Sequence, residues 1–307
     1  MRTDLDHLPE RQQDELRRVT QTLLAEFDKA IAGGTQPFRK AGQILKIILF
    51  GSYARNDWVD EPQNGYQSDF DLLIIVSHEP LTNIADYWYV AEDKILRDPT
   101  IQRTVNIIVH TMQEVNDALA KGQYFFTDIA RDGIALYELP NHPLATPKPA
   151  TAQEAYEMAK GYFERTGASI TEWLELAHHA VKKGDVGEWP NKAAFNLHQA
   201  TETAYACFLL VRTLYFPRSH NIKFLRGLAE ETDARLVAAW PRDNRADRRR
   251  FELLKRAYVE ARYSPSYTIS VEDLNALAEA VERLRNLVEA ASKERLAALR
   301  TDAGSGT

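Results

Sequence analysis

Two short apolar runs, separated by a glycine–serine pair and two aspartates, constrain the fold of this chain more than any other feature. The runs cover residues 44–50 and 72–76, are rich in β-branched residues and are bounded by polar turn residues. This pattern is typical of buried strands. Gly51 directly follows the first run, where a residue without a side chain lets the backbone turn sharply and a ligand approach closely.

The residues after Gly51 predict a phosphate site. Ser52 is expected to open a short helix over residues 52–55. The free N–H groups and the positive dipole end at a helix N-terminus suit a phosphate. The glycine–serine turn therefore predicts a cradle for the phosphates of a nucleotide.

Asp69 and Asp71 predict a metal site beside this cradle. They occupy alternate positions at the start of the second strand, so both carboxylates are expected on one face. Mg²⁺ is usually bound through carboxylates plus substrate phosphates, and a pair of metal ions can clamp the oxygens of a phosphoryl transfer. Gly-Ser alone is usually a turn and Asp-x-Asp alone a solvated loop. The ordered set of strand, Gly-Ser, helix, Asp-x-Asp and strand is far more specific and indicates a metal–nucleotide fold.

The motif Gly-Ser-Tyr-Ala-Arg at residues 51–55, followed by Asp-Phe-Asp at residues 69–71, resembles the nucleotidyltransferase superfamily that includes DNA polymerase beta. The short form is similar to the minimal and the kanamycin nucleotidyltransferases. In that superfamily the Gly-Ser pair holds nucleotide phosphates and the two aspartates bind Mg²⁺. The resemblance implies ATP as the nucleotide, Mg²⁺ or Mn²⁺ as the metal, and these site residues: Gly51, Ser52 and Arg55 for the nucleotide, and Asp69 and Asp71 for metal binding and catalysis.

The chain departs from this family at the third acid, which stands on a later strand and helps activate the acceptor. In the apolar run over residues 104–110, Asn106 takes the expected position. An asparagine offers a carbonyl oxygen but cannot act as a general base. Acceptor activation then depends on His110, Asp128 or an acid elsewhere, and the sequence does not choose among them.

Length and composition set the broad class. The 307 residues are long enough for two domains with separate cores, and a net charge of −6 argues against broad electrostatic binding of nucleic acid. The single cysteine, Cys207, allows no intrachain disulfide and fits a reducing cytoplasm. No secretory signal or membrane-spanning run is expected, so we predict a cytoplasmic protein without membrane contact.

The first domain is predicted over residues 1–140. Further strands are expected over residues 105–109 and 134–139, and helices over residues 5–31, 84–96 and 115–120 and around residues 125–129. This order gives an α/β domain with a small mixed sheet. The insert over residues 58–67 contains turn residues and is expected to be a loop. Four prolines over residues 139–150 predict a stiff linker at residues 141–150.

The second domain, over residues 151–300, is predicted to be all-α. Five helices joined by short connections indicate an up-down helical bundle, with a disordered tail at residues 301–307. The helices are expected over residues 155–183, 193–215, 221–231, 251–263 and 270–299.

Three segments of the helical half resemble a HEPN domain: Ala-Ala-Phe-Asn-Leu-His-Gln-Ala-Thr-Glu at residues 193–202, Ser-His-Asn-Ile at residues 219–222 and Ala-Arg-Tyr at residues 261–263. HEPN domains are helical bundles that often dimerise and that commonly occur beside minimal nucleotidyltransferases. The resemblance therefore implies a homodimer through the helical domain.

Many HEPN domains are ribonucleases whose motif is an arginine followed, four to six residues later, by a histidine. No histidine follows Arg262 at that spacing. Arg262, Tyr263 and Tyr267 could form a secondary nucleotide site in which the arginine binds a phosphate and a tyrosine stacks on a base. The alternative is an arginine at a helix end that packs on tyrosines.

Two histidines of the helical half are weaker candidates for a ligand site. His198 lies on an apolar helical face near Glu202 and is expected to be a core residue bonded to a neighbour. His220 precedes a helix and is expected to be a cap or a bundle contact.

These patterns leave three functions open. The first is Mg²⁺-dependent transfer of AMP from ATP to a hydroxyl of a protein, an RNA or a small molecule. The second is a nucleotide-binding regulatory module, of a toxin–antitoxin or defence type, in which Asn106 has disabled transfer. The third, disfavoured by the missing histidine, is a HEPN ribonuclease. The fold alone does not identify the acceptor.

Overall fold

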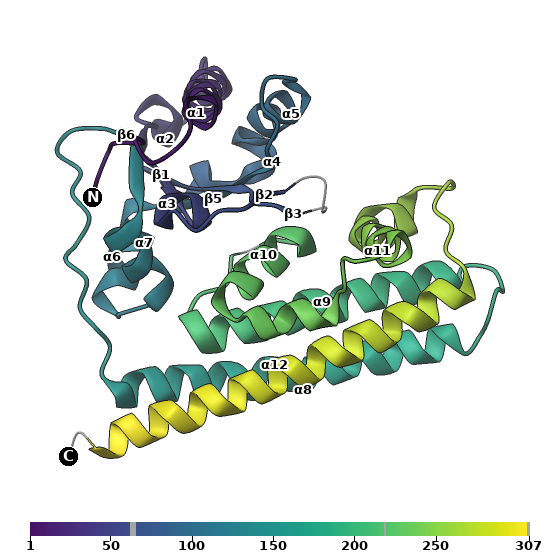
Figure 1. The fold of residues 1–307 in the computed structure, drawn as a ribbon. Coiled ribbons are helices and arrows are strands. Elements are labelled where there is room, and N and C mark those ends of the chain that lie inside the picture. Colours follow the sequence, from purple (N-terminus) through teal and green to yellow (C-terminus); the bar gives the residue numbers. More distant parts are fainter. Residues whose placement is uncertain (62–65, 218, 306–307) are drawn as a thin grey trace. The chain divides into compact units, whose positions relative to one another are not determined.

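The structure is a computed structural model that describes residues 1–61, 66–217 and 219–305. The chain divides into two compact units, Met1–Pro149 and Ala150–Thr307. This division falls inside the segment predicted to be a proline-rich linker. Each unit has its own secondary structure and core (Figure 1).

The first unit is built on a mixed four-stranded sheet, as the sequence predicts. The strand order is β5-β4-β1-β6, with β4 and β5 parallel and β1 antiparallel to both of its neighbours. All seven residues of β1 and of β4 are buried, which explains why these strands are apolar except for Lys46 and Asp71. The strands are β1 (Ile44–Phe50), β4 (Phe70–Val76), β5 (Val105–Thr111) and β6 (Ile134–Glu138).

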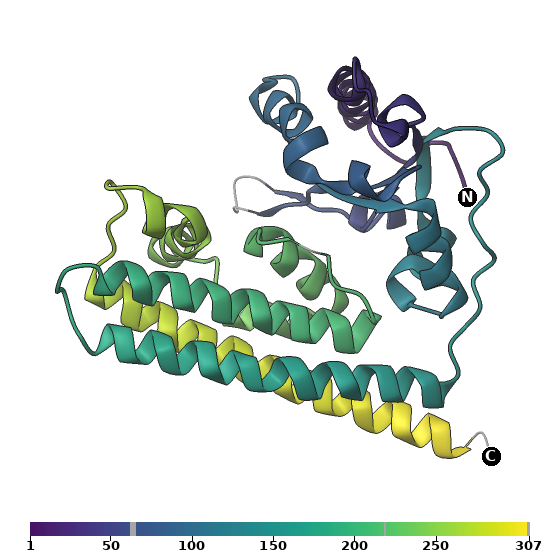
Figure 2. The ribbon, with the colours of Figure 1, turned by 180° about the vertical axis from the view of Figure 1, so that it is seen from behind.

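Helices cover both faces of this sheet (Figures 1 and 2). The apolar stripe of α1, which includes Leu16, Leu23 and Phe27, packs in one core cluster with Ile47 and Leu72. The helices α6 and α7 lie on the opposite face. The helices of this unit are α1 (Glu10–Ile31), α2 (Pro37–Lys40), α3 (Ser52–Arg55), α4 (Ile84–Tyr87), α5 (Tyr89–Arg97), α6 (Met112–Ala120) and α7 (Tyr124–Asp132), with a 3₁₀ helix, η2, at Glu79–Thr82.

Two local predictions in this unit are wrong. The helix expected over residues 84–96 is divided at Trp88, whose buried indole donates to the Leu81 carbonyl at 2.8 Å and stacks on Phe27. The insert predicted to be a loop contains a hairpin of two short strands, β2 (Asp60–Glu61) and β3 (Tyr66–Gln67). Residues 62–65 lie outside the described part of the chain.

The second unit is helical, and the described residues contain the five predicted α-helices. The three longest, α8, α9 and α12, lie side by side along most of their length (Figures 1 and 2). A capping box at Thr151 begins α8 directly after the prolines. The helices are α8 (Ala152–Val181), α9 (Trp189–Thr213), α10 (Ile222–Thr232), α11 (Arg245–Tyr263) and α12 (Val271–Ser305), with a 3₁₀ helix, η3, at Ala234–Ala239.

The predicted disordered tail at residues 301–307 is wrong for residues 301–305. The last helix continues through them because Leu299 is still buried and the Thr301 hydroxyl bonds to the Ala297 carbonyl at 3.0 Å. Residues 306–307 lie outside the described part. In the described part, no helix combines the length and apolar character needed to cross a bilayer.

Candidate nucleotide and metal site

The turn after β1 has the geometry expected of a phosphate cradle. Gly51 has φ 74° and ψ −155°, a backbone conformation that is open almost only to glycine. Its carbonyl accepts the N–H groups of Ala54 and Arg55 at 3.1 Å each, which starts α3. Ser52 is only 4% exposed, and its hydroxyl oxygen is buried without a hydrogen-bond partner. A buried hydroxyl without a partner is costly, so this position suits a residue that bonds to a ligand.

The two aspartates lie on one face of the sheet at the N-terminal end of β4, with Asp69 just before the strand and Asp71 its second residue. Asn106 stands beside Asp71 in the register of β4 and β5. Its amide nitrogen donates to Asp71 Oδ1 at 2.9 Å and approaches Asp69 Oδ2 at 3.4 Å. Asp71 and Asn106 are buried, whereas Asp69 is partly exposed. The three side chains therefore form one polar group that reaches from the interior to the surface.

The register of the sheet also places the cradle next to these acids. Phe50, the last residue of β1, pairs with Asp71, so Gly51 follows directly beside the aspartate. Neighbouring strands lie about 4.8 Å apart. The phosphate turn, Asp71 and Asn106 thus follow one another across three adjacent strands.

The donor set fits a hard divalent cation. Asp69 and Asp71 supply carboxylate oxygens that converge on one amide, and Mg²⁺ is usually held by one or two carboxylates plus substrate phosphates. Among the described residues, no three His, Cys, Asp or Glu side chains form a metal-ligand group. The third position carries Asn106, which here uses its N–H₂ group to separate two like charges.

His110 does not replace the missing acid. It pairs with Ile75 in the register, four residues along the strands from Asp71, which corresponds to about 13 Å. Its Nδ1 lies 3.2 Å from Glu114 Oε2, and this hydrogen bond is the main cause that lowers the pKa of Glu114 to about 2.

Asp128 lies on α7, and its carboxylate pairs with Arg131 at 2.9 Å. Partial burial raises the pKa of this carboxyl, although Arg131 and the more distant Arg55 act in the opposite direction. Arg55, at the end of α3, has its own ion pair with Asp57 at 3.1 Å. Because Arg55 of the motif influences the pKa of Asp128, this carboxyl stays a candidate for taking the acceptor proton.

The three residues of the predicted secondary site line one open pocket, and the Arg262 guanidinium lies 4.9 Å from the Tyr263 ring centroid. Arg262 and Tyr263 are exposed at the end of α11, beside an open pocket of about 520 Å³. The Arg262 guanidinium lies 4.7 Å from the Tyr258 ring centroid and 4.9 Å from the Phe195 centroid. Tyr267 is buried and its hydroxyl donates to the Leu253 carbonyl at 3.1 Å, so its ring is not offered to a base.

Two histidines and one glutamate form a polar group inside the helical unit. His198 is fully buried and its Nδ1 bonds to the Leu254 carbonyl at 3.0 Å, as expected of a core histidine. Its Nε2 lies 3.7 Å from Glu202, which also accepts from the exposed His220 at 3.0 Å. Burial raises the pKa of Glu202, but its interactions with His198 and His220 outweigh burial and hold the pKa below its ordinary value of 4.5.

Replacing Glu202 with glutamine is expected to destabilise the helical unit by about 1–3 kcal/mol at neutral pH, because the hydrogen bond from His220 is accepted by an ionised carboxylate. A group whose folded pKa is lowered stabilises the fold above its unfolded pKa, and this contribution is lost as the pH falls through the folded value. The difference between wild type and Glu202→Gln in thermal unfolding should therefore shrink below pH 4.5.

The matched control is Glu282→Gln, which removes a half-exposed glutamate that lies 3.2 Å from His178. This substitution should change stability by less than about 1 kcal/mol. Equal effects of the two substitutions across the pH range would show that Glu202 has no special role.

Sequence reasoning missed a buried network behind the aspartates. Arg103, just before β5, binds Glu15 and Asp60 and donates to the Tyr53 hydroxyl. The only signal was that Glu15 and Gln12 fall among the buried positions of α1, where apolar residues are the rule.

A mixed sheet that joins a Gly-Ser phosphate turn to an Asp-x-Asp pair defines the first unit as a nucleotidyltransferase-type domain, and the second unit is a separate bundle of helices. Comparison with protein families agrees with both. The family described as "Nucleotidyltransferase domain" matches residues 36–124, and the family described as "HEPN domain" matches residues 171–292. The chain thus fuses an N-terminal nucleotidyltransferase domain to a C-terminal HEPN domain. Comparison with curated proteins finds no match.

Proposed function

We propose that this protein transfers a nucleoside monophosphate, AMP from ATP, to a hydroxyl group in a Mg²⁺-dependent reaction. The acceptor oxygen bonds to the α-phosphorus, the bond from that phosphorus to the β-phosphate breaks, and pyrophosphate leaves. The observation that carries this proposal is the alignment of the Gly51 turn, Asp71 and Asn106 on adjacent strands. A triphosphate at the turn would lie next to the two carboxylates. This is the arrangement that phosphoryl transfer needs, since its catalysis rests on positioning and on neutralising charge.

Each residue has a distinct task in this proposal. The Ser52 hydroxyl and the backbone of the Gly51 turn bind the phosphates, and Arg55 adds a positive charge at the end of α3. Asp69 and Asp71 would hold Mg²⁺, and the metal, when bound, would supply positive charge beside the phosphates. Asn106 keeps the aspartates together but takes no proton. The acceptor proton therefore goes to another group, and Asp128, with its raised pKa, is our candidate.

The nature of the acceptor is a further part of the proposal. A protein hydroxyl, an RNA end and a small molecule all present the nucleophile that the reaction requires. We propose that the HEPN domain pairs two subunits, in line with the resemblance that identified it, and that the protein works in the cytoplasm.

A second function is favoured by one observation, the asparagine at position 106. If transfer is disabled, the same cradle and aspartates would bind a nucleotide without chemistry, as in a regulatory module of a toxin–antitoxin or defence system. A ribonuclease is disfavoured because no histidine occurs among residues 263–269.

Incubation with α-labelled ATP and Mg²⁺, with and without cell lysate, tests these functions by comparing wild type with Asp69→Asn. Label on the protein or on a lysate component that is lost in Asp69→Asn supports transfer. Bound ATP without any label supports the binding module and contradicts transfer. Cleavage of RNA that persists in EDTA and in Asp69→Asn would instead assign a ribonuclease.

A further inference from the structure

Arg103 is a buried charged side chain of the first unit that has no part in the proposed binding of metal or phosphate, yet all three of its side-chain nitrogens donate hydrogen bonds. Its side chain is 1% exposed. Three of its nitrogens donate to three separate elements: Nε to the Tyr53 hydroxyl at 2.7 Å, one terminal nitrogen to Glu15 Oε1 at 2.7 Å, and the other to Asp60 Oδ2 at 2.5 Å. A buried guanidinium with this many partners is fixed in one orientation.

The partners of Arg103 come from the elements around the candidate site. Glu15 is on α1, Tyr53 follows the phosphate-binding Ser52 in α3, and Asp60 is on β2 of the hairpin that links the cradle to the aspartates. The hairpin is joined back to the strand end, since the Ser68 N–H donates to the Val59 carbonyl at 2.9 Å. Arg103 therefore bonds both to the helix that carries Ser52 and to the hairpin that leads to the aspartates.

Phe70 links Arg103 and Tyr53 to the two aspartates. It lies between Asp69 and Asp71 in the chain, and because side chains alternate along a strand its ring points to the face opposite to theirs. That ring packs edge-on against Tyr53 at 4.5 Å, and the Arg103 guanidinium lies 5.9 Å from its centroid. The Phe70 N–H also donates to the carbonyl of Thr104, the residue after Arg103, at 2.8 Å.

We propose that Arg103 is a positioning residue of the nucleotide site. It touches neither metal nor nucleotide, but it fixes Tyr53 and Phe70 relative to each other and thereby sets the spacing between Ser52 and the two aspartates. This inference rests on the proposed function, because it assumes that a metal–nucleotide complex binds there. A purely structural role would stabilise the unit without tuning the affinity of the folded protein.

The test measures Mn²⁺ binding by electron paramagnetic resonance in the presence of ATP, at a temperature where circular dichroism shows each variant to be folded. Arg103→Gln is expected to weaken binding of Mn²⁺ and ATP about tenfold or more, the usual effect of removing a residue that orients metal ligands. If Arg103→Gln does not fold, Tyr53→Phe decides, since it removes only the hydroxyl that accepts from Arg103. It should weaken binding about two- to tenfold, as expected for one hydrogen bond.

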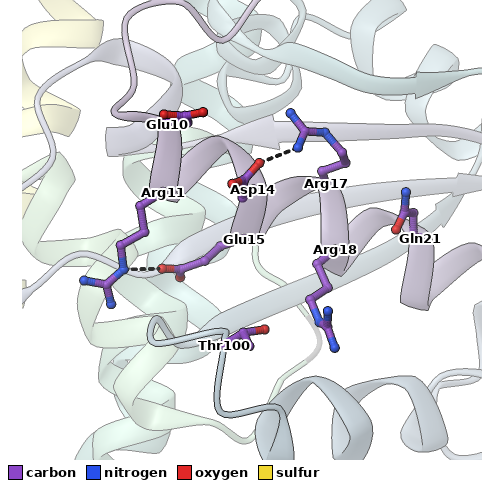
Figure 3. A pocket seen from close by; sticks show the side chains of 8 residues that line it. All are labelled: Glu10, Arg11, Asp14, Glu15, Arg17, Arg18, Gln21 and Thr100. Carbon is purple, nitrogen blue, oxygen red and sulfur yellow. Dashed lines mark hydrogen bonds and ion pairs between the residues drawn. The ribbon is translucent and has the colours of Figure 1, made fainter.

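Arg11→Gln is the matched control. Arg11 also pairs with Glu15, at 3.2 Å, but it is 54% exposed at the edge of an open pocket of about 570 Å³ (Figure 3). Arg11→Gln removes the same positive charge beside the same glutamate as Arg103→Gln does. Because Arg11 is exposed and bonds to neither Tyr53 nor Asp60 in the contacts described, Mn²⁺ binding should remain within twofold of wild type.

The outcomes separate this inference from the proposed function. If wild type binds no Mn²⁺ with ATP, the proposed function fails and the inference fails with it. If wild type binds but folded Arg103→Gln and Tyr53→Phe bind equally well, only the positioning role is overturned. The same holds if Arg11→Gln weakens binding as much as Arg103→Gln, because charge near Glu15 would then explain the effect.

Discussion

Replacing Asp71 with asparagine is expected to reduce transfer of labelled AMP at least about a hundredfold, the scale seen when a group that stabilises developing charge is removed. Asp71 is 5% exposed and lies beside the phosphate turn in the sheet register, so solvent cannot substitute for its charge. The measurement is the rate of label transfer in Mg²⁺, together with the Mn²⁺ affinity in the presence of ATP. Both should fall.

The same substitution is expected to leave the fold intact. Asp69 and Asp71 carry like charges that share one amide donor, so removing one charge relieves repulsion in the metal-free protein. The thermal unfolding temperature should therefore stay near that of wild type. Asp117→Asn makes the same change of charge at an exposed position on α6 and should preserve transfer. A folded Asp71→Asn protein with normal transfer would remove Asp71 from the proposed mechanism.

The sheet and the motif could be predicted because their signals are local. The strand at Ile44–Phe50 is apolar except for Lys46, and the glycine that ends it marks the turn, where the backbone takes a positive φ. The Asp-x-Asp spacing places both carboxylates on one face for any regular strand. The parallel register that brings Asn106 beside Asp71 could be expected only through the resemblance to a family, since the two lie 35 residues apart.

Sequence could not reveal the network of Arg103, because its partners depend on the tertiary fold. Glu15, Tyr53 and Asp60 lie 88, 50 and 43 residues away in the chain. The same limit explains the helix break at Trp88, since the contact that decides it is with Phe27 on α1. Burial likewise leaves only 3% of Tyr267 exposed in the pocket that it lines with Arg262 and Tyr263, and no signal in the sequence predicted this difference in exposure.

The asparagine at position 106 decides between the two leading functions, and its replacement by aspartate tests them. A third carboxylate would remove the amide that now donates to Asp71 and would add a like charge, so metal-free Asn106→Asp should unfold at a lower temperature than wild type. With Mn²⁺ and ATP bound, Asn106→Asp should instead unfold at a higher temperature than wild type. An added charged ligand should tighten Mn²⁺ binding on the order of tenfold, since ligand charge sets the affinity of such sites.

Asn116→Asp provides the matched control, because the Asn116 side-chain oxygen accepts from the Ala145 N–H at 2.8 Å and an aspartate keeps that acceptor. This variant should bind Mn²⁺ as wild type does. If wild type transfers no label and Asn106→Asp does, Asn106 has silenced the chemistry and the natural protein works by binding a nucleotide. If wild type transfers label and Asn106→Asp transfers it faster, the protein is an enzyme whose acceptor proton goes to a group such as Asp128. Unchanged Mn²⁺ affinity in Asn106→Asp would place the metal away from Asn106 and contradict the proposed metal site, because a new carboxylate beside Asp71 must alter the affinity for any cation held there.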